Sequence, residues 1–125
     1  MIQNQAIENK SFTFKIVEQN NICLVVFNGY LSKKSSAIAE DCLNSIKSSS
    51  CEVFIFDFQN VSFIEKTSHR FLVGLQKEIK SKEGAELKLC SLTSTFKQDL
   101  LDAGIIRNND VFRSTKDVLL RMTMR

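Results

Sequence analysis

The chain has 125 residues, of which 43% are hydrophobic and 25% charged, so it can form one ordinary hydrophobic core but not two. Its net charge of +3 comes from 17 basic and 14 acidic side chains with alternating signs, which argues against nucleic-acid binding. There is no basic-then-apolar leader and no apolar run of about 18 residues, so we expect a cytoplasmic protein that does not insert into a membrane.

The first third of the chain predicts a strand hairpin. Residues 1–10 are polar and without periodicity, so we expect a loose lead-in. Apolar and polar side chains alternate over 11–17, as in a half-buried strand. The turn at 18–21 contains two asparagines and is typical of a hairpin. The continuously apolar run 22–27 predicts a strand buried on both faces, which Asn28-Gly29 then breaks or bends.

A helix is predicted next, with Ser32 as its N-cap and the serines at 48–50 as its end. A strand follows over 52–58 and is expected to stop at a polar turn, Gln59-Asn60. A short apolar patch then leads into a second helix over 66–81, which contains Gly74. We attribute this mid-helix glycine to close packing on the sheet.

The last third repeats the strand-helix alternation. Gly84 is placed to end the second helix, and a strand runs from about residue 85 to 91. A short helix over 93–103 is closed by Gly104. Val111-Phe112 predicts a last strand, and Ser114 caps a final helix. The residues of this helix expected to face inward are Val118, Leu119 and Met122.

The order β-β-α-β-α-β-α-(β)-α predicts an α/β fold: a mixed, mostly parallel sheet of four to five strands, packed with about four helices. Right-handed crossovers would lay the helices on the sheet. We expect one domain over residues 1–125.

Catalytic and metal-binding patterns are weak in this sequence. The single histidine, His69, falls on the first turn of a predicted helix without a facing nucleophile. Asp57 and Glu65 have ordinary structural explanations, as a strand-end residue and as a favourable charge at a helix N-terminus. The four cysteines form no C-x-x-C pair, and there is no glycine-rich phosphate loop. We therefore predict no catalytic residues, no metal, no cofactor and no enzymatic activity.

Element order and local motifs together resemble the STAS domain family, which includes bacterial anti-sigma factor antagonists. Members typically read G-x-L-D after the second strand, and here Asn28-Gly29-Tyr30-Leu31 occupies that segment. They then show D-(L/F)-x-x-(V/L)-x-(F/Y)-(I/M), which Asp57 to Ile64 matches closely. Phe96 to Gly104, followed by Ile105, looks like the family's L-x-x-x-G-(L/I) ending. The resemblance covers about residues 11–124.

The sequence departs from the family where the family's function resides. The family motif D-S-(S/T)-G corresponds to Glu65, Lys66, Thr67 and Ser68, so a lysine replaces the serine that a partner kinase phosphorylates in sigma-switch members. A lysine cannot take this phosphate, although it can simply extend into water. Thr67 aligns with the second hydroxyl: it is a candidate phosphoacceptor, or a helix cap. Ser32 replaces the aspartate of G-x-L-D.

The resemblance implies a non-enzymatic regulatory domain that binds a partner through the loop and helix start at 61–70. The partner would be an anti-sigma factor, a kinase-like switch protein or a signalling scaffold, and the oligomeric state stays open. The predicted partner-binding residues are Ser32, Ser62, Glu65, Lys66, Thr67, Ser68, His69 and Arg70. One alternative is a STAS subunit of an anion or lipid transport assembly. A weaker one is nucleotide binding at the strand ends, which titration with GTP and ATP would test.

Overall fold

The computed structural model describes residues 11–123, and the first feature it contains is the predicted hairpin. Strands β1 (Thr13–Gln19) and β2 (Ile22–Leu31) pair antiparallel, with Gln19 opposite Ile22. The two turn residues, Asn20 and Asn21, have φ values of 53° and 69°. Asparagine tolerates this left-handed conformation well, which explains why this pair forms a two-residue hairpin turn.

The remaining strands lie parallel to β2 and extend the sheet in chain order. They are β3 (Val53–Ile64), β4 (Glu86–Cys90) and the short β5 (Val111–Phe112). The five-stranded sheet has the order β1-β2-β3-β4-β5, in which only the β1-β2 pair is antiparallel. The predicted fold class, a mixed and mostly parallel sheet with helices, is therefore confirmed.

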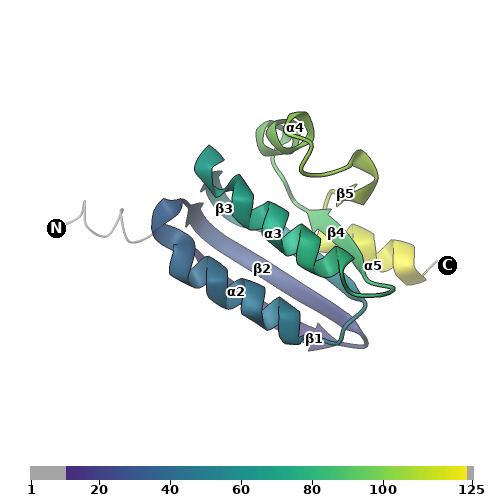
Figure 1. Cartoon of the computed structure of the whole chain (residues 1–125). Coiled ribbons are helices and arrows are strands. Elements are labelled where there is room, and N and C mark those ends of the chain that lie inside the picture. Colours follow the sequence, from purple (N-terminus) through teal and green to yellow (C-terminus); the bar gives the residue numbers. More distant parts are fainter. Residues whose placement is uncertain (1–10, 124–125) are drawn as a thin grey trace.

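Helices connect the parallel strands and cover the sheet (Figure 1). The α-helices are α2 (Ser36–Ser48), α3 (His69–Lys80), α4 (Ser94–Asp102) and α5 (Thr115–Thr123). The single 3-10 turns are η1 (Lys33–Ser35), η2 (Lys66–Ser68) and η3 (Asn108–Asp110). Helices α2 and α3 lie side by side on one face of the sheet, and α5 lies on the opposite face (Figure 1).

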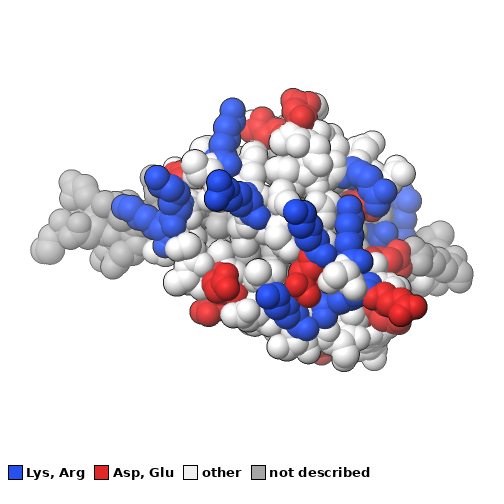
Figure 2. Space-filling view, in the orientation of Figure 1, with Lys and Arg blue, Asp and Glu red and all other residues white. Residues whose placement is uncertain are grey.

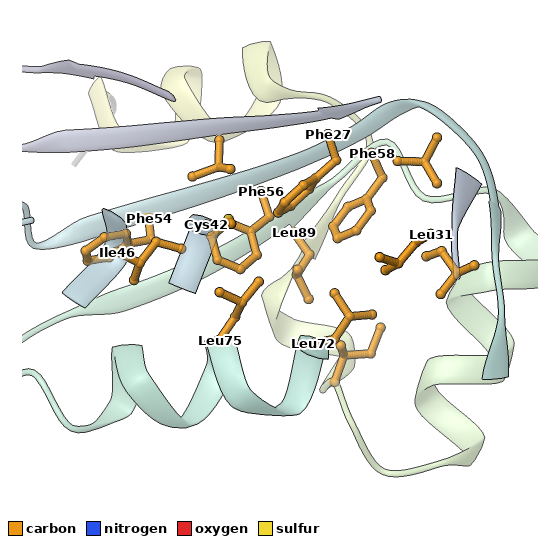
Figure 3. Close-up of a cluster of buried hydrophobic side chains, with 14 of the residues drawn as sticks. Phe27, Leu31, Cys42, Ile46, Phe54, Phe56, Phe58, Leu72, Leu75 and Leu89 are labelled. Carbon is orange, nitrogen blue, oxygen red and sulfur yellow. The ribbon is translucent and has the colours of Figure 1, made fainter. Parts of the chain in front are cut away.

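The main core fills the space between the sheet and the α2-α3 layer. In Figure 3 the side chains of Phe27, Phe56 and Phe58 point from the strands toward Leu72 and Leu75 of α3. Burial is complete for Phe27 and Leu75, at 0% exposure. A smaller cluster around Ile55, Cys90 and Val118 lies under α5. Five of the ten phenylalanines are buried and supply much of this core: Phe12, Phe27, Phe54, Phe56 and Phe58.

Strand β3 runs straight through the segment predicted to be a turn. Gln59 and Asn60 belong to the strand, because β2 continues alongside and pairs with it as far as Leu31 opposite Ile64. Two register irregularities, between Val26 and Asn28 and between Gly29 and Tyr30, accommodate the polar residues. A β-bulge places extra residues on one strand without ending the pairing, which explains the wrong prediction. Likewise, β2 continues through Asn28-Gly29.

Asp57 lies within β3 rather than at its end, and it ties the strand to α5. Its side chain is buried, with 9% exposure. Oδ1 accepts a hydrogen bond from the Gln59 amide at 2.8 Å, and Oδ2 accepts one from the Thr115 hydroxyl at 2.8 Å. The carboxylate therefore satisfies an amide beside the bulge and anchors the first turn of α5, where a negative charge is also favourable.

Two further expectations about burial are wrong. Strand β2 is not buried on both faces: fully buried and half-buried residues alternate along it, because α5 covers only part of the second face. On α5, Val118 is buried but Leu119 is 39% exposed. The helix packs through one narrow stripe, so Leu119, one residue after Val118, turns away from the sheet. Among residues 11–123, no helix is long and apolar enough to cross a membrane.

Candidate functional site

The carboxyl ends of β2 and β3 bring two separate parts of the chain together. Leu31 pairs with Ile64 at the last position of both strands, and the Glu65 amide donates to the Leu31 carbonyl at 2.9 Å. Each strand then enters a 3-10 turn that begins a helix: η1 before α2, and η2 before α3. In parallel sheets such strand ends form the edge on which binding residues gather.

Glu65 is the residue that joins the two turns. Its Oε1 accepts a hydrogen bond from the Thr67 hydroxyl at 2.7 Å, and the Lys33 amide donates to the same oxygen at 3.4 Å. Thr67 therefore does not cap a helix: its hydroxyl donates to a side chain, and neither η2 nor α3 has a side-chain cap. This carboxylate holds η1 and η2 in a fixed relation.

Ser32 caps η1, as predicted. Its hydroxyl accepts from the Lys34 amide at 3.2 Å, and the Ser35 hydroxyl accepts from the Ser32 amide at 3.1 Å. These two bonds form a capping box, which satisfies amides that the turn leaves without partners. Ser32 is thus held rigidly and has a structural role, whatever else it contacts.

Basic side chains surround this edge. Lys33, Lys34, Lys66 and Arg70 are all exposed. Within residues 11–123, none of them forms an ion pair, since the two salt bridges there are Lys88 with Glu86 and Arg107 with Asp110. In Figure 2, blue side chains border the N-terminal ends of α2 and α3, and uncharged surface lies between them. The edge therefore presents several cations without ion-pair partners in the described chain, around the Glu65 carboxylate that joins its two turns.

A groove of about 300 Å³ opens between α2 and α3 beside these charges. Its apolar lining comes from Leu31, Ala39, Leu43 and Phe71, together with Gly74. The polar residues that line it are Ser32, Lys33, Ser36, Glu40, Thr67, Ser68 and Arg70. The groove thus combines an apolar lining with hydroxyls and charges, and it includes four of the predicted binding residues.

Gly74 lies along this groove and not against the sheet, so the expectation of close packing is wrong. A Cβ atom built at Gly74 would meet nothing within 4 Å, and the residue does not have a positive φ. A glycine inside a helix costs about 1 kcal/mol relative to alanine. At this position that cost is not offset by any packing contact that only glycine allows.

Replacing Gly74 with alanine is therefore expected to raise the free energy of unfolding by about 0.5–1 kcal/mol, because the helix gains propensity and the methyl group meets no obstacle. Urea denaturation followed by far-UV circular dichroism measures this change. A loss of stability in Gly74→Ala would mean that the fold itself requires the empty space.

The other predicted residues do not all join the groove. Ser62 is exposed, and its hydroxyl donates to the Gly29 carbonyl at 3.2 Å. Lys66 points outward at the start of η2 and does not line the groove, and His69 is half-exposed beside it. Residues 61–64, expected in a loop, are the end of β3. Ser68 is buried, with 7% exposure, so it cannot offer much contact surface.

Sequence reasoning missed Lys33 and the groove residues of α2. Lys33 follows the predicted cap directly, and that position could have indicated a charge at the helix start. Ala39 and Leu43 belong to an apolar stripe of helical period, which does not distinguish residues facing the sheet from residues facing a neighbouring helix. Only the packing of α2 beside α3 separates the two cases.

The surroundings of each cysteine disfavour the thiolate form of its side chain. Burial raises the pKa of Cys42 and of Cys90 to about 12, and that of Cys23 to about 11. Burial also raises the pKa of Cys51, which is only half-buried and whose sulfur contacts Glu18 Oε2 at 3.5 Å. A thiol with a pKa above its usual range is mostly protonated at neutral pH, and the thiolate is the nucleophile.

Iodoacetamide at pH 8 is therefore expected to alkylate the native chain first at Cys51, the cysteine with the most accessible sulfur, and last at Cys42 and Cys90. Peptide mapping by mass spectrometry over time gives the order. In urea all four sites should react at similar rates, because burial is lost. Native labelling of Cys42 as fast as that of Cys51 would contradict this account.

No metal site is evident in the part of the chain that the structure describes. There, no group of three or more histidine, cysteine, aspartate or glutamate side chains is placed to hold a metal ion.

Comparison with known proteins places the whole described fold in one family. The family model described as the STAS domain matches residues 13–118. No curated protein sequence matches the chain. Similar solved structures include the anti-sigma factor antagonist SpoIIAA of Bacillus in its unphosphorylated form, which is 14% identical, with 90% of this chain and 96% of that chain covered and a TM-score of 0.70.

Two other solved structures are similar over most of their length. An anti-sigma-factor antagonist (STAS) domain protein from Planctomyces limnophilus is 17% identical, with 89% and 98% of the chains covered and a TM-score of 0.73. A sulfate transporter family protein from Wolinella succinogenes is 20% identical, with 86% and 89% covered and a TM-score of 0.71. At these identities the likeness shows a shared fold.

Proposed function

This chain belongs to the STAS domain family, and from that premise we propose that it is a non-enzymatic regulatory domain that binds a partner protein. The binding surface is the edge formed by η1, η2 and the start of α3. The partner is a regulatory protein of the anti-sigma factor, kinase-like or scaffold kind. The observation that carries this proposal is the exposed basic edge, which is fixed in place by Glu65 but leaves its own cations unpaired within residues 11–123.

The geometry supports a contact surface better than a reaction site. His69 and Thr67 are close in the chain, but the Thr67 hydroxyl donates to the Glu65 carboxylate and not to an imidazole. Nucleophilic catalysis needs a base within hydrogen-bond reach of the nucleophile. Charged side chains at an interface fix its register and speed the encounter of the partners.

Lys66 gives this surface a different charge from that of the family pattern. At the position that corresponds to the phosphorylated serine, it contributes a permanent positive charge instead of a hydroxyl that can become an anion. On this proposal the surface is always able to bind its partner, because residue 66 cannot be phosphorylated to make the partner dissociate.

Reversing charge at this edge tests the proposal. We expect Arg70→Glu to reduce recovery of the partner by about tenfold or more when the tagged full-length chain is used to purify it from the cytosol of the natural host. Lys80→Glu is the matched control, because it makes the same charge change at the far end of α3. An equal loss of partner recovery in both variants would indicate a general effect of charge and would contradict binding at this edge. If the unaltered chain captures no protein, the proposal is overturned.

Thr67 remains the candidate phosphoacceptor. Its phosphorylation would replace the hydrogen bond to Glu65 by repulsion between two anions, so η1 and η2 would lose a connection. Intact-mass measurement after co-expression with neighbouring kinase genes tests this point. A shift of about 80 Da, the mass of one phosphate group, that maps to Thr67 would mean that the switch is displaced by one residue.

A transport role is the second candidate, favoured by the similarity to the Wolinella succinogenes sulfate transporter family protein. On that reading the chain is a STAS subunit of an anion or lipid transport assembly. Genes for permease and ATPase subunits beside this one would favour it, and sigma-factor or kinase genes would count against it.

A further inference from the structure

We propose that the groove between α2 and α3 receives one amphipathic helix of the partner protein, with acidic side chains at the end that lies over Lys33 and Arg70. The inference rests on the proposed function and specifies which part of a partner is recognised. The apolar face of the incoming helix would cover Leu43 and Phe71, which are half-buried and still in contact with water.

The lining of the groove is suited to an apolar surface. Leu31 and Ala39 form its deeper part, at 2% and 9% exposure, while Leu43 and Phe71 are less buried. Covering half-buried apolar side chains removes them from water, which is the main favourable term in such an association.

Gly74 gives the groove its width. Its missing side chain leaves open space beside Phe71 on α3, and nothing else in the described chain occupies that space within 4 Å of a built Cβ. No packing contact within the described chain explains why a glycine stands inside this helix. A residue of a binding partner that occupies the open space would explain it. A bulky side chain of the incoming helix is the natural occupant.

The basic side chains at one end of the groove favour acidic side chains on the partner helix. Lys33 and Arg70 line the groove, and neither forms an ion pair within residues 11–123. The first turns of α2 and α3 contain no acidic residue to offset the positive ends of the two helices. Glu65 is engaged with Lys33 and Thr67, and Glu40 is the one acid along the groove. A carboxylate brought by the partner would meet a positive field.

The walls favour a helix over an extended peptide. Both walls are helices, and beyond the first and last turns their backbone groups are bonded within each helix. An extended peptide would find no strand edge there and would leave its own backbone groups without partners. A helix satisfies its own backbone and needs only side-chain contacts, as in helix-in-groove recognition.

Photo-crosslinking in the natural host identifies what lies in the groove. The photoreactive residue benzoylphenylalanine replaces Ser36, which is exposed and lines the groove, in the full-length chain. A matched probe replaces Asp41, exposed on the same helix but outside the groove. We expect a polypeptide adduct at position 36 and not at position 41. Mass spectrometry of the adduct should map it to an amphipathic helical segment that contains acidic residues.

Closing the groove provides the decisive comparison. Gly74→Met fills the open space and is expected to lower the yield of the position 36 adduct by about tenfold, while Lys80→Met, which introduces the same side chain on α3 outside the groove, changes it by less than about threefold. Circular dichroism checks that both variants fold. An unchanged yield in Gly74→Met, an equal adduct at position 41, or an adduct that is a lipid or other small molecule would each overturn the inference.

A third probe separates this inference from the proposed function. Benzoylphenylalanine in place of Lys66, which is exposed on η2 and does not line the groove, reports on the edge itself. An adduct at position 66 without one at position 36 would contradict the groove inference but leave a partner bound at the edge. No polypeptide adduct at either position would count against both. Arg70→Glu should also lower the yield of the position 36 adduct, because Arg70 lines the groove. Recovery of that yield when a partner acid is changed to lysine would support the predicted charge pairing.

Discussion

Replacing Phe27 with alanine is expected to lower the free energy of unfolding by about 3–5 kcal/mol. Phe27 is fully buried and packs against four other rings, with centroid distances of 5.2 Å to Phe58, 5.5 Å to Phe56, 5.6 Å to Phe12 and 6.2 Å to Phe71. Phe27 belongs to β2, and the four other rings come from β3, from the residue before β1 and from α3. The truncated side chain therefore leaves a cavity that no single element can close by moving.

Phe63→Ala is the matched control for Phe27→Ala. Phe63 is 41% exposed, and its ring pairs with those of Tyr30 and Phe96, at centroid distances of 5.0 Å and 6.2 Å. Its loss should cost about 1 kcal/mol, mostly from these aromatic contacts. Urea denaturation followed by circular dichroism compares the two variants. A smaller loss for Phe27→Ala than for Phe63→Ala would contradict the description of the core.

Gly29→Ala is the second large effect, with an expected loss of about 3 kcal/mol or more. Gly29 has a φ of 92°, where a side chain is strained. A Cβ atom there would also overlap the carbonyl oxygen of Ser11, a backbone atom that cannot turn aside. Since the Gly29 carbonyl accepts the Ser62 hydroxyl, the variant should also disturb the end of β3, where the candidate site begins.

Gly104→Ala separates the two causes of this loss. Gly104 has a φ of 72°, but a Cβ atom built there meets nothing within 4 Å. Gly104→Ala should therefore lower the free energy of unfolding only by the cost of the left-handed backbone conformation, about 1–2 kcal/mol. Thermal and urea unfolding of both variants give the difference, which measures the clash with Ser11. Equal losses in the two variants would mean that the close approach at Gly29 is not a constraint.

Much of the fold was predictable because its elements have strong local signals. Asn20-Asn21 supports the left-handed turn of the hairpin, Ser32 caps η1, and Gly104 takes a positive φ value just after α4 ends. Gly84 also has a positive φ, but it lies in the turn before β4, because α3 already ends at Lys80. The alternation of strands with helical stripes then restricts the sheet to a mostly parallel arrangement. These features depend on residues near each other in the chain, so they can be predicted from the local sequence.

The candidate site was predictable in its location but not in its structure. The resemblance of Asp57 to Ile64 pointed to the strand end and helix start, and both Thr67 and Arg70 do lie on the exposed edge. It did not reveal that Glu65 reaches the Lys33 amide, since these residues are 32 positions apart. Nor did it distinguish the residues of α2 that face α3 from those that face the sheet.

The sequence by itself determined the order of strands and helices, the hairpin turn at Asn20-Asn21 and the cap at Ser32. Tertiary structure alone decided that β3 continues through Gln59-Asn60, because the pairing with β2 supplies hydrogen bonds that local turn preferences cannot outweigh. It also decided that Gly74 opens a groove instead of packing on the sheet. A groove exists only between two packed helices, and no local pattern encodes the space that their packing leaves.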